Sequence, residues 1–539
     1  MVSSFAFAVF MLLIIKFIDN KIRVMAYNNF RAIILVPFIL IFCTPPKNRT
    51  SSQLGDIHFT ATGKKEAMPY FEKGLLLLHS FEYADAAEEF QKARAIDPSF
   101  VMAYWGEAMT YNHPLWRYQN FEKATTVLNA LAPSAEERIN KAKTEIEKDF
   151  IRSLAILYGK GSKAQRDKQY AGFMESLYKK YRGNPEISCF YSLSLIGSVE
   201  VGRDEAIYEQ AAVIAKKVLD KYPRHPGALH YLIHAYDDPG HAAQALATAD
   251  AYSKTAPDAG HALHMPTHIY LALGMWDKVV SSNEVSWAAG EKRKERKKLN
   301  NDALNYHAFH WLAYGYLQQG EIAKAKKILH DMKRYNDELI SERARAHLIF
   351  IKTTYLAETN EWDPAIVSIK VPHKDLNIVT RAKNYFIDGW HAFHKKDEAA
   401  LAAIIQTLAG ERLIDLQRVS SEGPAICGSI SSETPNLLDV QYTEVMELEL
   451  RALASWLKND LPGTEQFLKK ATTLENSISY SYGPPDIVKP SNELYGDWLG
   501  KQSRPQEALI QYDLALKAAP KRILSMKGKD KASRALSLP

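Results

Sequence analysis

Hydrophobic positions recur along most of the chain with the spacing of paired amphipathic helices. In residues 67–100, large apolar side chains stand at positions 4, 11 and 24 of a 34-residue unit, and small residues stand at positions 8 and 20. Small residues such as Gly74 let two helices approach closely, and large ones such as Phe90 fill the seam between them. Pro98, at position 32, ends the second helix because proline cannot continue it. The pattern predicts an antiparallel helix pair.

The same register recurs further along the chain, whereas the alternation typical of strands is scarce. Strong matches occupy 226–259, 260–293, 306–339 and 489–522, and weaker helical pairs occupy 101–134, 140–222, 343–409 and 444–477. The unit resembles the tetratricopeptide repeat (TPR). This resemblance implies an all-α fold, a TPR-type α-solenoid of stacked antiparallel helix pairs in which each pair buries its face against the next.

The repeats give a division of the chain into six segments. We predict a signal or anchor segment at 1–44, a linker at 45–64, N-terminal TPR and helical pairs at 65–222, central histidine-rich TPR units at 223–340, helical pairs with an irregular loop (410–440) at 341–443, and C-terminal TPR units with a capping helix at 444–539.

The amino terminus carries two apolar runs, at 5–18 and 32–42, and the second is too short to span a bilayer. A basic residue before it and polar residues after it describe an export signal. Leu40-Ile-Phe-Cys43 resembles a bacterial lipobox with Cys43 as the lipidated residue, although Phe42 stands where a small residue is usual. The alternatives are an ordinary secretory signal and an uncleaved anchor, and translation starts at Met1 or Met25. We expect a location in the cell envelope, periplasmic or lipid-anchored, with membrane contact only through this segment.

Composition excludes several classes of protein. Hydrophobic residues make up 46% and charged residues 24%, which fits a globular chain and neither a disordered nor a polytopic membrane protein. The net charge of +6 is too small to indicate nucleic-acid binding. Three cysteines cannot form a disulfide framework. Histidine is the exception, because nine of the 17 fall between positions 225 and 310.

These histidines hold fixed places in the repeat. His230 and His234 are at positions 5 and 9 of one unit, and His264 and His268 hold the same positions 34 residues later. Positions 2 and 5 of these and the next unit add three more: His261, His307 and His310. Positions 2, 5 and 9 share the helix face opposite the core positions. We therefore predict a row of imidazoles on the concave groove of three repeats.

Two histidines four residues apart on a helix can chelate one metal ion, and two such pairs on adjacent helices can supply four nitrogens. Imidazole favours a transition metal such as Zn, Cu or Fe. Asp237 and Asn283 are candidates to support or complete such a site. Pro266 predicts a kink between His264 and His268. Further candidates to line the groove are His113, Trp116 and Glu147.

Three strings are more specific than the repeat pattern: His113-Pro-Leu-Trp116, His230-Tyr-Leu-Ile-His234 and His261-Ala-Leu-His-Met-Pro-Thr-His268. They resemble a group of bacterial TPR-domain proteins. The resemblance implies the fold and no settled activity.

Three functions stay open at this point. The first is an exported TPR solenoid whose histidine-lined groove binds a ligand, with a transition-metal ion as the leading candidate. The second is a metal-dependent enzyme that uses the same histidines. The third is a metal-free envelope scaffold whose groove binds a peptide, a protein partner or a small ligand.

Overall fold

A computed structural model describes residues 53–419, 435–480 and 483–537 of the chain. Contacts divide the chain into two units, Met1–Thr50 and Ser51–Pro539, and the description below concerns the second. Cys43 and the predicted signal segment lie outside the described residues. The described part is helical except for one short hairpin.

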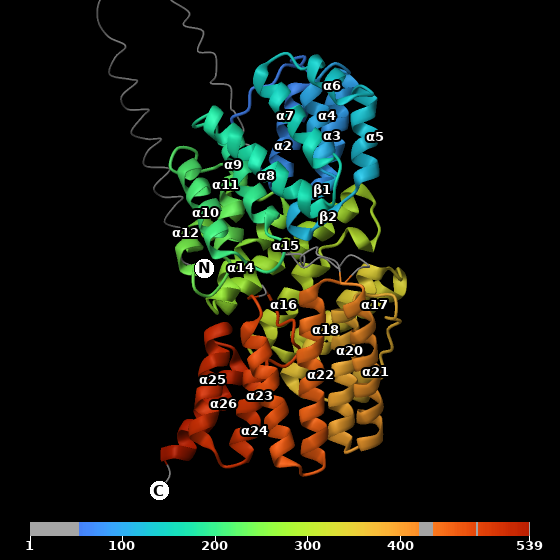
Figure 1. The fold of residues 1–539 in the computed structure, drawn as a ribbon, viewed down its shortest axis with the longest axis vertical. Helices are drawn as coiled ribbons and strands as arrows, with labels where there is room; N and C mark the ends of the chain where they lie inside the picture. Colours follow the sequence, from blue (N-terminus) through green and yellow to red (C-terminus); the bar gives the residue numbers. More distant parts are fainter. Residues whose placement is uncertain (1–52, 420–434, 481–482, 538–539) are drawn as a thin grey trace, which may run out of the picture. The chain divides into compact units, whose positions relative to one another are not determined.

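The helices follow one another along the chain with short connections (Figure 1). In the first half they are α2 (Met68–His79), α3 (Tyr83–Ile96), α4 (Val101–Met109), α5 (Phe121–Leu131), α6 (Ala135–Lys141), α7 (Glu145–Leu157), α8 (Lys163–Lys180), α9 (Pro185–Ser198), α10 (Glu205–Leu219), α11 (Pro226–Tyr236), α12 (Leu246–Thr255), α13 (Gly260–His264), α14 (Pro266–Ala272) and α15 (Trp276–Lys297). In the second half they are α16 (Tyr306–Gln318), α17 (Ile322–Glu338), α18 (Glu342–Thr359), α19 (Pro364–Val367), α20 (Ile378–Lys395), α21 (Glu398–Gln417), α22 (Leu437–Leu457), α23 (Leu461–Ser477), α24 (Ser491–Lys501), α25 (Pro505–Ala518) and α26 (Ile523–Ser537). Short 3-10 helices are η1 (Pro114–Trp116), η2 (Ala242–Ala245) and η3 (Asn301–Ala303).

Successive helices pack as antiparallel pairs, and each pair packs on the next, so the predicted TPR-type α-solenoid is confirmed. The first and last repeats use the same packing device. The buried ring of Phe90 lies against both Gly74 and Gly106, where an added Cβ would approach ring carbons to 2.8 and 2.3 Å. Tyr512 is held in the same way, between two helical glycines 16 residues before and after it, Gly496 and Gly528. Glycine at these places lets neighbouring helices close on the aromatic ring.

Two local irregularities interrupt the regular helix pairs near the histidines. The strands β1 (Asn112–His113) and β2 (Tyr118–Gln119) pair antiparallel across η1, with Asn112 opposite Gln119 and His113 opposite Tyr118. The first helix of the second central unit (260–293) is divided at Met265, just before Pro266, into α13 and α14. The predicted interruption at Pro266 is therefore present.

The carboxyl-terminal helices return to the central repeats. Arg522 is fully buried, and its guanidinium contacts Glu493 at 2.8 Å, Glu358 at 2.5 Å and the hydroxyl of Tyr314 at 3.0 Å. The indole of Trp276 donates to the carbonyl of Lys521 at 3.0 Å. The last segment thus covers α16 and α18 in addition to capping the repeat before it.

Two predicted irregular segments differ from the structure at their edges. Residues 410–417 belong to α21 and 437–440 to α22, while 420–434 lie outside the described residues. Within the predicted linker 45–64, the described residues lie against the repeats. The backbone N–H of Asp56 donates to the carbonyl of Arg224 at 3.0 Å. Thr62 donates through both its N–H and its hydroxyl to the carboxylate of Glu147, at 2.6 and 2.7 Å.

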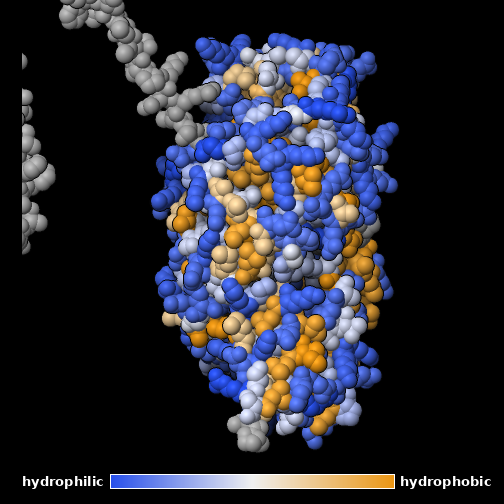
Figure 2. All heavy atoms as spheres, turned by 90° about the vertical axis from the view of Figure 1, so that its left-hand side faces the viewer, coloured by the Kyte–Doolittle hydropathy of each residue, from blue (hydrophilic) through white to orange (hydrophobic). Residues whose placement is uncertain are grey.

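The surface is mostly polar, with hydrophobic patches on the face shown in Figure 2. Exposed apolar side chains of the last helices include Ile510 and Leu514 on α25 and Met526 on α26. Among the described residues, we find no helix that combines the length and the apolar character needed to cross a membrane.

Candidate metal centre

Six of the predicted histidines gather into two groups of three. His230, His234 and His261 form the first triad, and His264, His268 and His307 form the second. Each residue offers one ligand atom, and within a triad these atoms lie within 4.8 Å of one another. The triads adjoin, because the ring centroids of His234 and His268 are 5.3 Å apart and those of His261 and His264 are 6.1 Å apart.

The repeat explains this division. Each triad takes positions 5 and 9 of one repeat and position 2 of the next, so α11 and α13 supply the first triad and α13, α14 and α16 the second. From the sequence, the two i,i+4 pairs could supply four nitrogens to one ion. In the structure they belong to two different sets of ligands. Position 2 of the following repeat completes each set instead.

Hydrogen bonds at Nδ1 fix the tautomers of two of these histidines. His230 Nδ1 lies 2.7 Å from the backbone carbonyl of His79, and His264 Nδ1 lies 2.7 Å from Oδ1 of Asn283. The amide nitrogen of Asn283 donates to the carbonyl of Val279 at 2.9 Å, which orients its Oδ1 toward His264. A carbonyl oxygen can only accept, so each Nδ1 carries the proton and each Nε2 keeps its lone pair.

One carboxylate oxygen anchors the Nδ1 atom of one histidine in each triad. Asp237 Oδ2 lies 3.3 Å from Nδ1 of His234 and 3.1 Å from Nδ1 of His268. Burial raises the pKa of Asp237 to about 6, although its hydrogen bond to His268 and the nearby Arg203 act in the opposite direction. Arg203 also binds Asp238, at 2.9 Å.

Several of the Nε2 atoms on the other side of these rings have no hydrogen bond among the described residues. The buried Nε2 atoms without a hydrogen-bond partner among the described residues include those of His230, His234, His261, His264 and His307. Leaving a buried polar atom unsatisfied costs about 1–3 kcal/mol. Burial lowers the pKa of His234 to about 3 and that of His264 to about 4, so both imidazoles are neutral at pH 7. Neutral imidazoles are the form that binds metal ions.

Aromatic rings enclose the two triads. Phe81 packs on His230 with 4.2 Å between ring centroids, and Trp116 lies 5.7 Å from His261. Trp311 lies 4.6 Å from His268 and 5.0 Å from His264. An apolar pocket adjoins the first triad and is lined by residues that include Phe81, Tyr231, Leu78 and Phe190. These walls exclude water and strengthen electrostatic interactions inside.

The position of the cluster corrects the prediction of an open groove. His230, His234 and His264 have no exposed surface, and His261 and His307 are partly buried. The face formed by positions 2, 5 and 9 therefore lies inside the described unit. A ligand here would be enclosed by protein.

The remaining predicted residues fall into two groups. Asp237, Asn283 and Trp116 contact the cluster as described above. His113 stacks on Tyr83, with 3.8 Å between centroids, and its Nε2 donates to the carbonyl of Thr110 at 2.9 Å.

Two predicted residues, His310 and Glu147, have other partners in the structure. His310 pairs with the hydroxyl of Thr354 at 2.9 Å and is in neither triad. The carboxylate of Glu147 accepts the backbone N–H of Thr144 in a capping box and is also bound by Thr62. The pattern Thr144-x-x-Glu147 is the sequence signal for this capping role.

Sequence reasoning missed a second buried histidine cluster. His79 donates from Nε2 to Glu186 at 2.7 Å, and His225 donates from Nε2 to the other oxygen of Glu186 at 3.1 Å. The hydroxyl of Tyr231 is 2.9 Å from Nδ1 of His79, and Cys189 Sγ is 3.6 Å from Nδ1 of His225. We call this group the Glu186 cluster.

No described protein family and no curated protein matches the sequence. Several solved structures are similar in part. Yeast Tom70 is 12% identical, with 88% of this chain and 89% of that chain covered and a TM-score of 0.31. A human IFIT1 dimer with m7Gppp-AAAA is 15% identical, with 90% and 91% covered and a TM-score of 0.36. The P58(IPK) TPR domain is 13% identical, with 87% and 98% covered and a TM-score of 0.22. At such scores these similarities carry no conclusion about ligands or partners, and the TPR assignment rests on the repeat register and packing described above.

Proposed function

We propose that this protein is a TPR solenoid that holds a transition metal in its six-histidine cluster. The observation that carries the proposal is the set of buried Nε2 atoms without partners among the described residues, of which those of His230, His234 and His264 stand opposite Nδ1 atoms that are anchored by acceptors. A metal ion bound by these nitrogens would remove the cost of leaving them unsatisfied. Anchored Nδ1 atoms are what metal-binding histidines require, because they fix the orientation of the ring.

The donor set restricts the metal. Imidazole nitrogen binds Zn, Cu, Fe and Ni well, whereas Mg and Ca prefer oxygen ligands. Both triads consist of imidazoles alone. We therefore expect one of the transition metals and no alkaline-earth ion.

A second candidate function is catalysis at the metal. Three protein ligands leave a coordination position open for water or a substrate, which is typical of catalytic sites and not of closed structural ones. The apolar pocket beside Phe81 gives an organic molecule a place next to the first triad. A metal-dependent enzyme is accordingly the alternative to a binding protein.

We also propose that the chain is exported and anchored through Cys43. The support is the apolar run before Cys43 and its lipobox-like residues. Fractionation of cells that produce the full chain, with Cys43→Ser as the comparison, tests it. We expect the native protein in the membrane fraction and the variant in the soluble envelope fraction; native protein in the cytoplasm would refute export.

The metal proposal is tested by metal analysis of full-length protein purified without chelators and without an affinity tag. We expect stoichiometric transition metal in the native protein and a large loss in the double variant His230→Ala/His264→Ala. His310→Ala is the matched control, because this histidine is on α16 beside the second triad but outside it, and it should keep the metal. Native protein that neither contains nor takes up Zn, Cu or Fe would refute the proposal and leave the metal-free scaffold for peptides or proteins.

A further inference from the structure

The two triads are separate ligand sets that share one supporting carboxylate. We infer that the cluster is a dinuclear copper centre, with one cuprous ion bound by each triad. This inference rests on the proposed function and names the number of ions and their charge.

The first step is the number of ions. Each triad brings three ligand atoms within 4.8 Å of one another, and no histidine belongs to both. The same three repeat positions form each set, so the second set is a copy of the first, one repeat along the chain. One ion can satisfy the Nε2 atoms of one triad only. The Nε2 atoms of His264 and His307, which have no partner among the described residues, then require a second ion.

The second step concerns a competing arrangement. His234, Asp237 and His268 also have potential ligand atoms close together. The carboxylate of Asp237, however, lies at Nδ1 of both rings, on the side away from Nε2. A metal ion at that place would break both hydrogen bonds and leave the Nε2 atoms of the remaining histidines unsatisfied. Asp237 therefore acts as a support for one ligand of each triad.

The third step is the charge of the ions. Two divalent ions would bring four positive charges into a buried site whose six ligands are neutral. Asp237 and Asp238 supply two negative charges, and Arg203 forms an ion pair with each of them and offsets one. The cost of burying an ion rises with the square of its charge, so a monovalent ion costs roughly fourfold less than a divalent one in the same place. Among metals that bind imidazole, copper has a stable monovalent state.

The fourth step is the coordination number. Zinc in proteins is almost always four-coordinate, so two zinc ions would need two further ligands inside the aromatic walls formed by Phe81, Trp116 and Trp311. Cuprous ion is stable with three ligands. Three imidazoles in each triad therefore complete its coordination without an added anion.

The test is an anaerobic titration of the metal-free full-length protein with cuprous ion, in competition with the chromogenic chelator bicinchoninate. We expect two equivalents in the native protein and one equivalent in His261→Gln or His307→Gln. These two histidines are the partly exposed members of their triads, so their replacement disturbs the core least. The double variant should bind none tightly, and His310→Gln should bind two. Circular dichroism verifies folding.

Several results would overturn the inference. These are one equivalent in the native protein, loss of both equivalents in either single variant, and displacement of copper by an equal concentration of zinc. The native stoichiometry is decisive even if a variant fails to fold. A protein that binds one ion of any transition metal refutes the dinuclear centre only, whereas one that binds none of them refutes the proposed function as well.

Discussion

The described residues contain two buried histidine clusters that both involve His79. They differ in what their Nε2 atoms contact. In the Glu186 cluster, both Nε2 atoms donate to one carboxylate, which also accepts the backbone N–H of His58 at 3.1 Å. In the six-histidine cluster, the carboxylate of Asp237 lies at Nδ1 of His234 and His268, and the Nε2 atoms of five rings have no hydrogen-bond partner within the part of the chain that the structure describes. The side chain of His79 belongs to the first cluster and its carbonyl supports the second.

The difference shows which features indicate a ligand site. Both clusters are buried, and both bring three or more potential ligand atoms within 4.8 Å of one another. The Glu186 cluster pairs both of its Nε2 atoms with a carboxylate, whereas five Nε2 atoms of the six-histidine cluster have no acceptor or donor partner among the described residues. Three ligand atoms at close range are therefore a weaker sign of a metal than unsatisfied nitrogens with anchored opposite sides.

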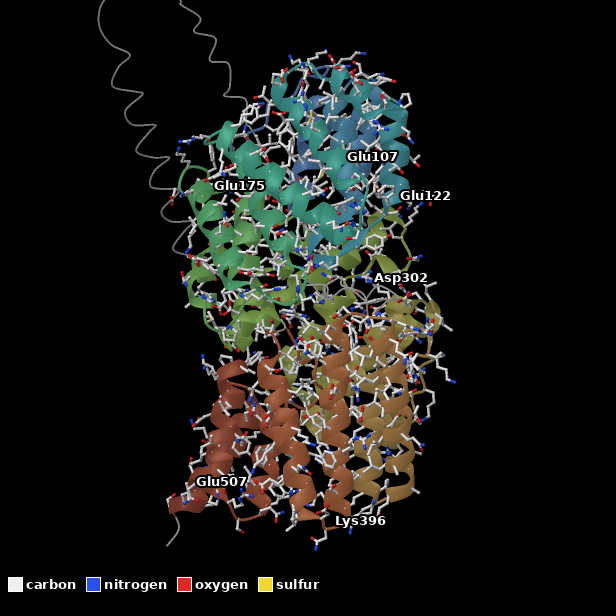
Figure 3. All side chains as sticks on the ribbon, viewed as in Figure 1. Glu107, Glu122, Glu175, Asp302, Lys396 and Glu507 are labelled. Atoms are coloured by element: carbon white, nitrogen blue, oxygen red, sulfur yellow. The ribbon has the colours of Figure 1, made fainter. Side chains whose placement is uncertain are left out.

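The largest expected effect comes from removing the carboxylate that completes the Glu186 cluster. Glu186→Ala leaves two buried imidazole N–H groups without acceptors, so we expect the free energy of unfolding to fall by about 3–5 kcal/mol. Chemical denaturation measures the loss. The matched control is Glu122→Ala, at the exposed position labelled in Figure 3, which should change stability by less than about 0.5 kcal/mol. A loss below 1 kcal/mol for Glu186→Ala would contradict the structural role that we assign to this cluster.

We expect a smaller effect from removing a side chain that holds one histidine of the six-histidine cluster in place. Asn283→Ala removes the acceptor that holds Nδ1 of His264, so metal affinity should fall about 10- to 100-fold with the number of bound ions unchanged. Competition with a chelator of known affinity measures this. Ser281→Ala, at an exposed position on the same helix, should leave the affinity as it is. An unchanged affinity in Asn283→Ala would mean that His264 is held by other contacts.

A further effect is that of pH on the metal-free protein. The pKa values of His234 and His264 are about 3 and 4 in the folded chain and about 6.5 when unfolded. Their contribution to stability is therefore complete above pH 6.5 and is lost as the pH falls, by about 1.4 kcal/mol per unit for each histidine. Urea denaturation at pH 7.5, 5.5 and 4.5 tests this. In His264→Leu, the dependence of the free energy of unfolding on pH should be weaker by the contribution of one histidine, about 1.4 kcal/mol per pH unit. An unaltered pH dependence would show that His264 does not titrate in this way.

Much of the fold and part of the site could be predicted from the sequence. The 34-residue register predicts the helix pairs, and it predicts that His230 and His264 hold equivalent positions in successive repeats. The division into triads was missed because His261 and His307 complete the sets of the preceding repeat, and only the stacking of helices brings position 2 of one unit to positions 5 and 9 of the other. The Glu186 cluster had no signal at all, since His79 and Glu186 are 107 residues apart and follow no common register.

The burial of Arg522 against Tyr314 has a consequence for the order of synthesis. The two residues are 208 positions apart. At translation rates of about 5–20 residues per second, the central repeats leave the ribosome roughly 10–40 s before the segment that covers them. During that interval Tyr314 and Glu358 lack their final partner, and the repeats around the histidines are still uncovered on that side. We therefore expect a chain shortened before residue 520 to be captured by chaperones or degraded, even though every histidine of the cluster is present in it.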